Sequence, residues 1–285
     1  MLSHASIGIC LAFAAAGQTN QTAESFAELQ AQATAAWKEG KATEALALAT
    51  RAVALDDRNV NAYLFRGKIL EALARHTDAI ADFTKVTELD PQAAEAFDRR
   101  GSERFKLGQI AASIEDFDRF IALKPDAEPG HWKRGIAYYY AQQFEKGRKQ
   151  FEGYEKVDTN DVENAVWRFL CMAKSSGIAR ARAEILKVGQ DKRVPMMNIY
   201  DLFAGNAKPE DVLAATQQGE PRPPELNQRR FYAHLYLGLF FDANGDRPKA
   251  IEHLSKAVEE HRIGHYMWDL ARVHLDLLRK TQPPR

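Results

Sequence analysis

Cysteine is almost absent from the sequence, which contains only Cys10 and Cys171. Cys10 lies in an N-terminal segment that we expect to be cleaved off. A single remaining thiol cannot form an internal disulfide, so the fold does not depend on one in any compartment. At 285 residues the chain is long enough to be stabilised by a continuous buried core instead.

An excess of one charge is also absent, because 39 Lys and Arg residues balance 39 Asp and Glu residues. We find no long run of like charge either. Proteins that attract nucleic acid or anionic lipid in a general way carry a basic excess. The composition therefore argues against both classes of partner. With 45% hydrophobic and 27% charged residues, it is typical of a globular protein.

The longest uncharged apolar run, ASIGICLAFAAA at residues 5–16, is too short to span a bilayer as a helix. It fits the apolar region of a secretory signal. Ala14 and Ala16 supply the small residues of an A-x-A cleavage site, which would leave Gly17 as the mature N-terminus. We therefore predict a signal peptide over 1–16, followed by a linker over 17–25, and an exported protein.

Two features of this segment keep alternatives open. Only the α-amino group and His4 stand in for the basic region of a signal, so an N-terminal helix of a cytoplasmic protein is the alternative. A lipid anchor on Cys10 is disfavoured, because Ile9 precedes the cysteine and most of the apolar run follows it.

Against this background, three kinds of residue recur with one spacing of 34. These markers are Gly67, Gly101 and Gly135; Phe83, Phe117 and Phe151; and Pro91 and Pro125. Three markers with the same spacing are hard to obtain by chance. A period of 34 is the length of the tetratricopeptide repeat, a helix-turn-helix unit with small residues in both helices and a closing proline.

The period predicts an all-α, right-handed tetratricopeptide solenoid of about seven repeats, two of them degenerate, with a C-terminal capping helix. The predicted segments are repeats at 26–59, 60–93, 94–127 and 128–161, two degenerate repeats at 162–230, a repeat at 231–264, and a capping helix and tail at 265–285. We expect the capping helix to close the open end of the array.

The repeated small residues indicate close packing of the two helices within a unit. Gly101 and Ser113 are twelve residues apart, and similar pairs occur in the other repeats. We expect each pair to let the two helix axes approach, and Phe117 to fill the gap against the next unit. Pro125 cannot continue a helix interior and so ends its pair.

We predict no catalytic, cofactor or metal site. His261 and His265 stand four apart, but a turn glycine lies between them and no third ligand is evident. Cys171 lies in an apolar run with no histidine partner implied by spacing, which favours a core residue. Gly205 and Gly245 fit helix ends and not a phosphate loop, since the sequence has no strand pattern.

The concave face of such a solenoid is the expected protein-binding surface, lined by residues 2, 5, 9, 12 and 13 of each unit. In the repeats at 94–127 and 128–161 we predict a groove of Glu95, Asp98, Ser102, Phe105, Lys106, Trp132, Ile136, Tyr139 and Tyr140. This groove is acidic and then aromatic, which argues against a clamp for a peptide carboxylate and favours a partner with basic residues. The alternative is that the aromatic residues are buried against the next helix.

The sequence resembles the NlpI-type tetratricopeptide proteins of the bacterial envelope over most of residues 60–280. The resemblance rests on HWKRGIAYYYAQQ, AVWRFLCMAK, NIYDLFAGNAKPEDVL, FYAHLYLGLFFDANGDRPKAIEHLSKAV and GHYMWDLA. It implies a non-enzymatic, homodimeric scaffold that holds a periplasmic processing protease together with cell-wall hydrolases. The apolar segment at 26–37, which no repeat precedes, also favours a homodimer. The alternative function is a cytoplasmic assembly factor or co-chaperone-like binding module.

Overall fold

The computed structural model describes residues 24–280, so the predicted signal peptide and most of the linker lie outside the described residues. Within this range the chain forms helices and no β-strand. The α-helices are α1 (Phe26–Lys38), α2 (Ala42–Leu55), α3 (Val60–Ala72), α4 (His76–Leu89), α5 (Ala94–Lys106), α6 (Ile110–Leu123), α7 (Trp132–Tyr140), α8 (Phe144–Tyr154), α9 (Val162–Ser176), α10 (Ile178–Ala183), α11 (Met196–Ala204), α12 (Pro209–Ala215), α13 (Pro223–Ala243), α14 (Arg247–Ser255) and α15 (Tyr266–Lys280). The chain divides into two compact units between Asp57 and Arg58.

The first unit consists of the α1/α2 helix pair. Ser25 caps α1: its hydroxyl accepts a hydrogen bond from the Glu28 amide, and the Glu28 carboxylate accepts one from the Ser25 amide at 2.8 Å. The buried residues between the two helices are mostly alanines, which permit close packing. Two large apolar side chains stay exposed on this pair, Trp37 at 37% and Leu55 at 51%.

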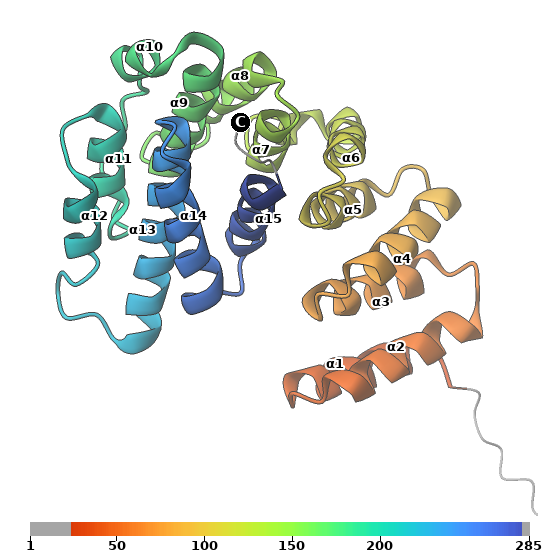
Figure 1. Ribbon diagram of the computed structural model, residues 1–285. Helices are drawn as coiled ribbons and strands as arrows, with labels where there is room; N and C mark the ends of the chain where they lie inside the picture. The colour runs from red at the N-terminus through yellow and green to blue at the C-terminus, as the bar shows by residue number, and fades with distance from the viewer. Residues whose placement is uncertain (1–23, 281–285) are drawn as a thin grey trace, which may run out of the picture. The chain divides into compact units, whose positions relative to one another are not determined.

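In the second unit, α3 to α8 form three consecutive helix pairs (Figure 1). Helices α3 and α5 begin at Val60 and Ala94, the first residues of two predicted repeats. Helix α7 begins four residues later than its predicted repeat, because a short 3-10 turn at Pro125–Ala127 and the Pro129-Gly130 step precede it. The 34-residue period thus predicts the starts of these three first helices to within four residues.

The glycines of these pairs lie under the phenylalanine rings of their own repeat. A Cβ atom added to the glycine would lie 2.6 Å from a Phe83 carbon at Gly67, 2.8 Å from Phe117 at Gly101 and 2.8 Å from Phe151 at Gly135. The small residue twelve positions on also contributes, since the Ser113 hydroxyl donates to the Gly101 carbonyl at 2.7 Å. The Phe117 ring contacts His131 of the following repeat as well, with ring centroids 4.8 Å apart.

A ladder of arginines with the same period links the helices. In each pair, an arginine of the first helix donates to a side chain sixteen residues later in the second: Arg66 to Asp82, Arg100 to Asp116 and Arg134 to Gln150. Arg100 also donates to the Thr87 hydroxyl of the preceding pair at 2.7 Å. The next member, Arg168, donates to the backbone carbonyl of Glu184. The ladder therefore extends into the degenerate part of the sequence.

The stretch from 162 to 230 contains four whole helices, α9 to α12, and the start of α13; of these, α10 and α12 are only six and seven residues long. Residues 184–195 between α10 and α11 form a loop. Helix α13 begins at Pro223, eight residues before the predicted start of its repeat at 231, because Pro223 and Pro224 occupy the first helical positions, where proline is tolerated.

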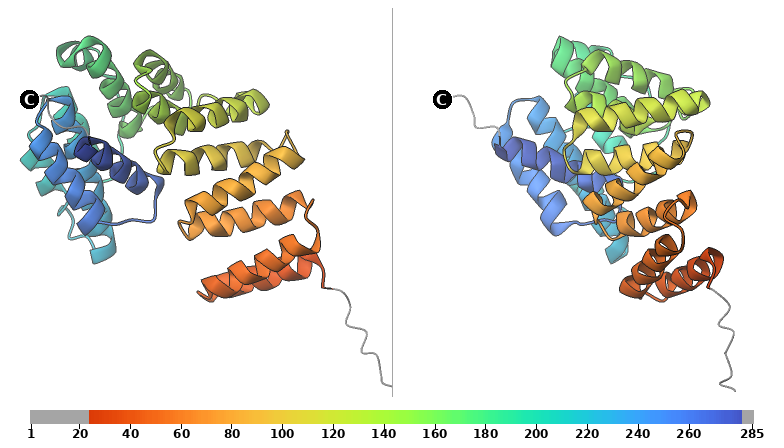
Figure 2. Two further views of the ribbon diagram at one scale, coloured as in Figure 1. Left: turned by 45° about the vertical axis from the view of Figure 1, so that its right-hand side comes forward. Right: turned by 90° about the vertical axis from the view of Figure 1, so that its right-hand side faces the viewer.

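The C-terminal helix α15 differs most from the prediction. It packs on α14 but lies on the inner side of the second unit, beside the first helices α5 and α7 (Figures 1 and 2). The Arg272 guanidinium donates to the carbonyl of Lys106 at 2.7 Å, and Tyr266 packs on Phe105. Helix α15 therefore covers part of the concave face in addition to following the last helix pair.

Candidate functional site

The structure brings the nine predicted groove residues together on α5 and α7, but α15 packs on three of the aromatic ones, Phe105, Trp132 and Tyr140. Tyr266 of α15 stacks on Phe105, with centroids 5.4 Å apart, and meets Trp132 edge-on at 5.3 Å. The Tyr140 hydroxyl lies 2.9 Å from Nδ1 of His274. An aromatic ladder therefore exists at this place, and the chain's own C-terminal helix packs against it.

Burial separates the predicted aromatic and apolar residues into two groups. Phe105, Ile136 and Tyr139 are buried, and Tyr139 meets Trp167 of α9 edge-on at 5.5 Å. Trp132 and Tyr140 are only half-buried. Among these aromatic and apolar residues, Trp132 is the one that both contacts α15 and lines the open groove.

The predicted acidic residues already have basic partners within the chain. Asp98 accepts from Lys133 at 2.7 Å and lies 3.0 Å from His131. Burial would raise the pKa of Asp98, but these hydrogen bonds and the Lys133 charge outweigh burial and lower it to about 2. Glu95 pairs with Lys68 and Arg99. Because these carboxylates are already paired within the chain, their charge is no argument for a basic partner.

The two remaining polar residues of the predicted groove are also bonded within α5. The Ser102 hydroxyl donates to the carbonyl of Asp98 at 2.9 Å. The Lys106 ammonium donates at 2.6 Å to the fully buried Glu103. Both side chains nevertheless line open space, in a groove of about 730 Å³.

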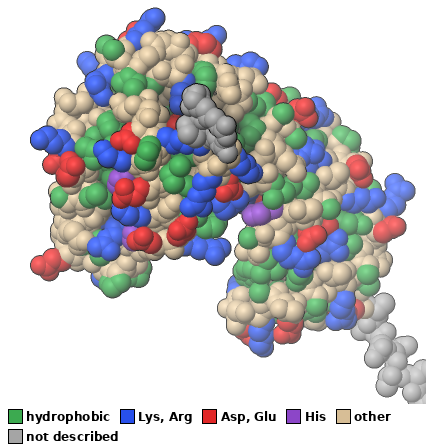
Figure 3. Space-filling view, in the orientation of Figure 1, with side chains coloured by type: hydrophobic (Ala, Val, Ile, Leu, Met, Phe, Trp, Pro, Cys, Tyr) green, Lys and Arg blue, Asp and Glu red, His purple; other side chains and the backbone are tan. Residues whose placement is uncertain are grey.

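This groove runs over the first helices α3, α5 and α7 and the start of α15. Its basic lining residues are Lys68, Arg99, Lys106, Lys133, Arg262 and Arg272, against the acidic Glu71 and Asp269. Most of these cations pair with carboxylates in or beside the groove, and acidic and basic side chains are interspersed on the face shown in Figure 3. The groove therefore offers charged hydrogen-bonding groups of both signs to a partner.

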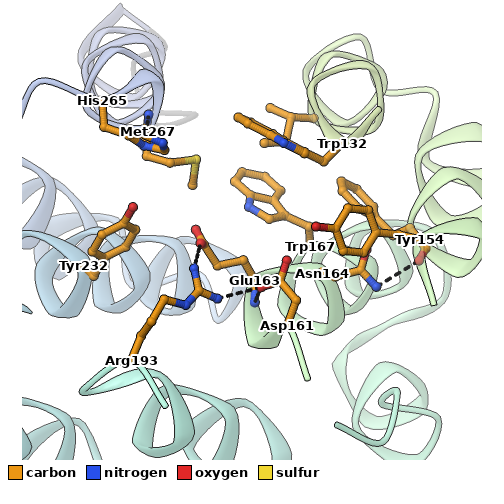
Figure 4. Close-up of a pocket in the computed structure, with 12 residues that line it drawn as sticks. Trp132, Tyr154, Asp161, Glu163, Asn164, Trp167, Arg193, Tyr232, His265 and Met267 are labelled. Atoms are coloured by element: carbon orange, nitrogen blue, oxygen red, sulfur yellow. Dashed lines mark hydrogen bonds and ion pairs between the residues drawn. The ribbon is translucent and has the colours of Figure 1, made fainter. Parts of the chain in front are cut away.

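A second, smaller cavity of about 220 Å³ opens next to Trp132 (Figure 4). It is lined by Trp132, Ile136, Phe151, Tyr154, Asp161, Glu163, Asn164, Trp167, Arg193, Tyr232, His265 and Met267. These residues come from α7, α8, α9, the 184–195 loop, α13 and the start of α15. We call this cavity the aromatic pocket.

A cluster of charges forms one side of the aromatic pocket. Arg193 donates to Asp161 at 2.7 Å, to Glu163 at 2.7 Å and to Asp191 at 2.6 Å. Burial lowers the pKa of Arg193, but the three carboxylates outweigh it, so the guanidinium stays charged. Burial raises the pKa of Glu163 despite Arg193. The cluster holds the 184–195 loop against the N-terminus of α9.

Two polar atoms of the pocket residues have no hydrogen-bond partner. They are Nε1 of Trp167, a donor, and Oδ1 of Asn164, an acceptor, and their residues are 2% and 6% exposed. An unpaired buried polar atom is costly, so native proteins rarely leave one without a reason. The other Asn164 side-chain atom, Nδ2, donates to the Phe151 carbonyl at 2.9 Å.

Sequence reasoning found Trp132 and Ile136 but missed the rest of this pocket. One signal was available: Trp167 follows Trp132 by 35 residues, one more than the period, just after the paired carboxylates Asp161 and Glu163. Arg193, Tyr232 and Met267 carried no such signal, since they come from a loop and from helices far along the chain.

The residues weighed for catalysis or metal binding have structural surroundings. His261 lies 3.2 Å from the Asn227 side-chain oxygen and stacks on His234, while His265 accepts from the Met267 amide. Burial raises the pKa of the Cys171 thiol, which disfavours the nucleophilic thiolate. Over residues 24–280 we find no group of three His, Cys, Asp or Glu side chains suited to a metal ion.

The helices between residues 24 and 280 include none with the length and apolarity required for a membrane span. The longest is α13, which has 21 residues and carries charged side chains along its first half.

The folded helix pairs and their inner groove define a helical-repeat protein, in which stacked units present an extended concave surface. More particularly, the fold is that of the tetratricopeptide-repeat proteins, as the 34-residue period predicted. Residues 31–94 match the family model described as tetratricopeptide repeat.

Solved structures agree with this fold. A tetratricopeptide repeat protein from Parabacteroides merdae superposes with a TM-score of 0.56 at 14% identity, covering 90% of this chain and 99% of that one. The MamA protein superposes with a TM-score of 0.52 at 22% identity, covering 55% of this chain and 86% of that one. The comparison with curated proteins gives no match.

Proposed function

We propose that the protein is a non-enzymatic adaptor that binds a segment of another protein along the groove over α3, α5 and α7. The observation that carries this proposal is the groove itself. Three successive first helices line about 730 Å³ of open space with alternating charged side chains and the half-buried Trp132. Side chains at matching repeat positions form a ladder that suits an extended or helical peptide segment.

Site-specific photo-crosslinking tests this function. A photoreactive amino acid at position 68, in the groove, should give adducts with a partner protein in native cells. The same amino acid at Glu115, on the exposed side of the second helix α6, serves as the matched control. Adducts at 68 and none at 115 support the adaptor, whereas no adduct at 68, or the same adducts at both positions, would contradict it.

We further propose that the protein is exported and acts in the bacterial envelope, with a periplasmic protease or a cell-wall hydrolase as partner. The support is the apolar run at 5–16 with its A-x-A site and the resemblance to NlpI-type proteins. N-terminal sequencing of the native protein tests it: a start at Gly17 supports export. A start at Met1 favours the alternative, a cytoplasmic assembly factor.

A homodimer is part of the same proposal. Its support is the first unit, whose Trp37 and Leu55 are large apolar side chains that remain exposed. Light scattering at micromolar concentration should give twice the monomer mass, and Trp37→Glu should return the mass to that of a monomer. A monomeric wild-type protein would contradict the proposal.

A further inference from the structure

The charged groups of the aromatic pocket are already satisfied by one another. Asp161 accepts from Arg193 and from the Glu163 amide, and Glu163 accepts from Arg193 and the Tyr236 hydroxyl. Asp191, behind them, accepts from Arg193 and from a backbone amide at the start of α9. Each carboxylate thus has at least two donors, and none of them requires an additional cation.

The neutral groups of the pocket are the ones without partners. Nε1 of Trp167 can only donate a hydrogen bond, and Oδ1 of Asn164 can only accept one. The two residues are three positions apart on α9, so their side chains lie on the same face of the helix. Figure 4 shows both at the wall of the pocket, beside Trp132 and Tyr154.

We propose that the aromatic pocket binds the side-chain carboxamide of a glutamine residue supplied by the partner. The carboxamide oxygen accepts from Trp167 Nε1, and its NH₂ group donates to Asn164 Oδ1. A carboxamide carries both functions on one planar group, whereas an ammonium or guanidinium only donates and a carboxylate only accepts. The proposal rests on the proposed function only for the source of the glutamine.

The size and depth of the pocket favour one long, neutral side chain. Its volume of about 220 Å³ is below the roughly 300–1,000 Å³ typical of small-molecule sites. Trp167 and Asn164 are almost fully buried and their two unpaired atoms have almost no accessible surface, so a group that bonds to them must extend from the peptide by several bonds and displace the side chains that close them off. The rings of Trp132 and Tyr154 would pack on the methylene groups of the glutamine, and a neutral group avoids the desolvation cost of a charge.

Nuclear magnetic resonance can test the pocket without the partner. The sequence contains four tryptophans, so ¹⁵N-labelled protein gives four indole signals, and Trp167→Phe identifies the one from Trp167. The probe is Nα-acetyl-glutamine N-methylamide, compared with the glutamate and lysine compounds of the same form. We expect the Trp167 signal to shift and saturate with the glutamine probe, at a Kd at least about tenfold lower than for the other two.

A pair of variants separates the pocket from general effects. Asn164→Leu should weaken the glutamine probe about tenfold. Gln143→Leu is the matched control, since its oxygen is also buried without a partner but does not line the pocket. A Trp167 signal that does not shift in the wild type, or that responds equally to the lysine or glutamate probe, would overturn the proposal even if Asn164→Leu fails to fold.

The adaptor function and the pocket can fail separately. A partner crosslinked at position 68, together with no response of Trp167 to the glutamine probe, would leave the adaptor and remove the pocket. A selective response of Trp167 without any crosslinked partner would leave the pocket and remove the adaptor.

Discussion

The glycine in the first helix of a repeat has a testable energetic role, and Gly101 offers the clearest case. In Gly101→Ala the new Cβ would lie 2.8 and 2.9 Å from two Phe117 ring carbons and 3.1 Å from the Asp116 Cβ. Phe117 is fully buried and packed on His131, so its ring cannot easily move away. Overpacking of this kind costs about 1–3 kcal/mol.

The intrinsic helix preference acts in the opposite direction. Replacing glycine by alanine within a helix favours folding by about 0.8–1 kcal/mol. We therefore expect Gly101→Ala to lower the free energy of unfolding by up to about 2 kcal/mol, and Gly101→Leu to lower it further. Gly153 of α8 is the matched control, because a Cβ there meets no atom within 4 Å. Gly153→Ala should raise stability by a few tenths of a kcal/mol to about 1 kcal/mol.

Urea and thermal unfolding, followed by circular dichroism, measure both variants. For a domain of this size, 1 kcal/mol corresponds to a shift of about 2–4 °C in Tm. The two substitutions should move Tm in opposite directions although the chemical change is the same. A Gly101→Ala protein as stable as the wild type would show that the helix crossing does not require the glycine.

Three further predictions concern pH, the arginine ladder and Trp132. Burial, with the neighbouring His253, lowers the pKa of His234 to about 3, whereas an unfolded histidine titrates near 6.5. The unfolded chain therefore binds the proton first, so stability should fall by up to about 1.4 kcal/mol per pH unit as pH drops below about 6.5. His234→Gln should reduce this pH dependence, measured as the change in urea midpoint between pH 7 and 5. Arg100→Met should cost less than the about 3–5 kcal/mol of a fully unpaired buried charge, because the buried Asp116 keeps its hydrogen bond from Arg104, and the double variant with Asp116→Leu should recover most of the loss; equal losses in both would contradict a role for the charge. Trp132→Ala should weaken partner binding by about 2 kcal/mol or more, measured by calorimetry, with a smaller loss of stability; a lowered Tm at unchanged affinity would show that Trp132 is structural only.

The repeat period predicted much of the fold because helix packing in a solenoid is local. Val60 and Ala94 begin helices where the period places them, and the glycine positions mark close contacts. The arginine ladder has the same period and could have been found in the same way. The start of α13 was not predicted, because the repeat period places it at 231 whereas the helix begins at the two prolines 223–224.

The binding surface was less predictable because it depends on where α15 lies. Nothing in the sequence of α15 indicates that Tyr266 stacks on Phe105, about 160 residues earlier, in preference to the last repeat. The acidic character of Glu95 and Asp98 was visible in the sequence, but their pairing with Lys68 and Lys133 needs three-dimensional neighbours. The aromatic pocket combines six segments, and only its α7 part was predicted.

The arginine ladder also determines how unfolding can spread along the array. Arg100 bonds Asp116 within its own repeat and Thr87 in the preceding one, and Arg134 likewise bonds both Gln150 and Asp118. In a one-dimensional array, such bonds add to the nearest-neighbour coupling between units. Opening one repeat then removes a partner from the next, which favours all-or-none melting over fraying from one end. Thr87→Val removes this bond between neighbouring repeats, so it should broaden the unfolding transition and lower its m-value.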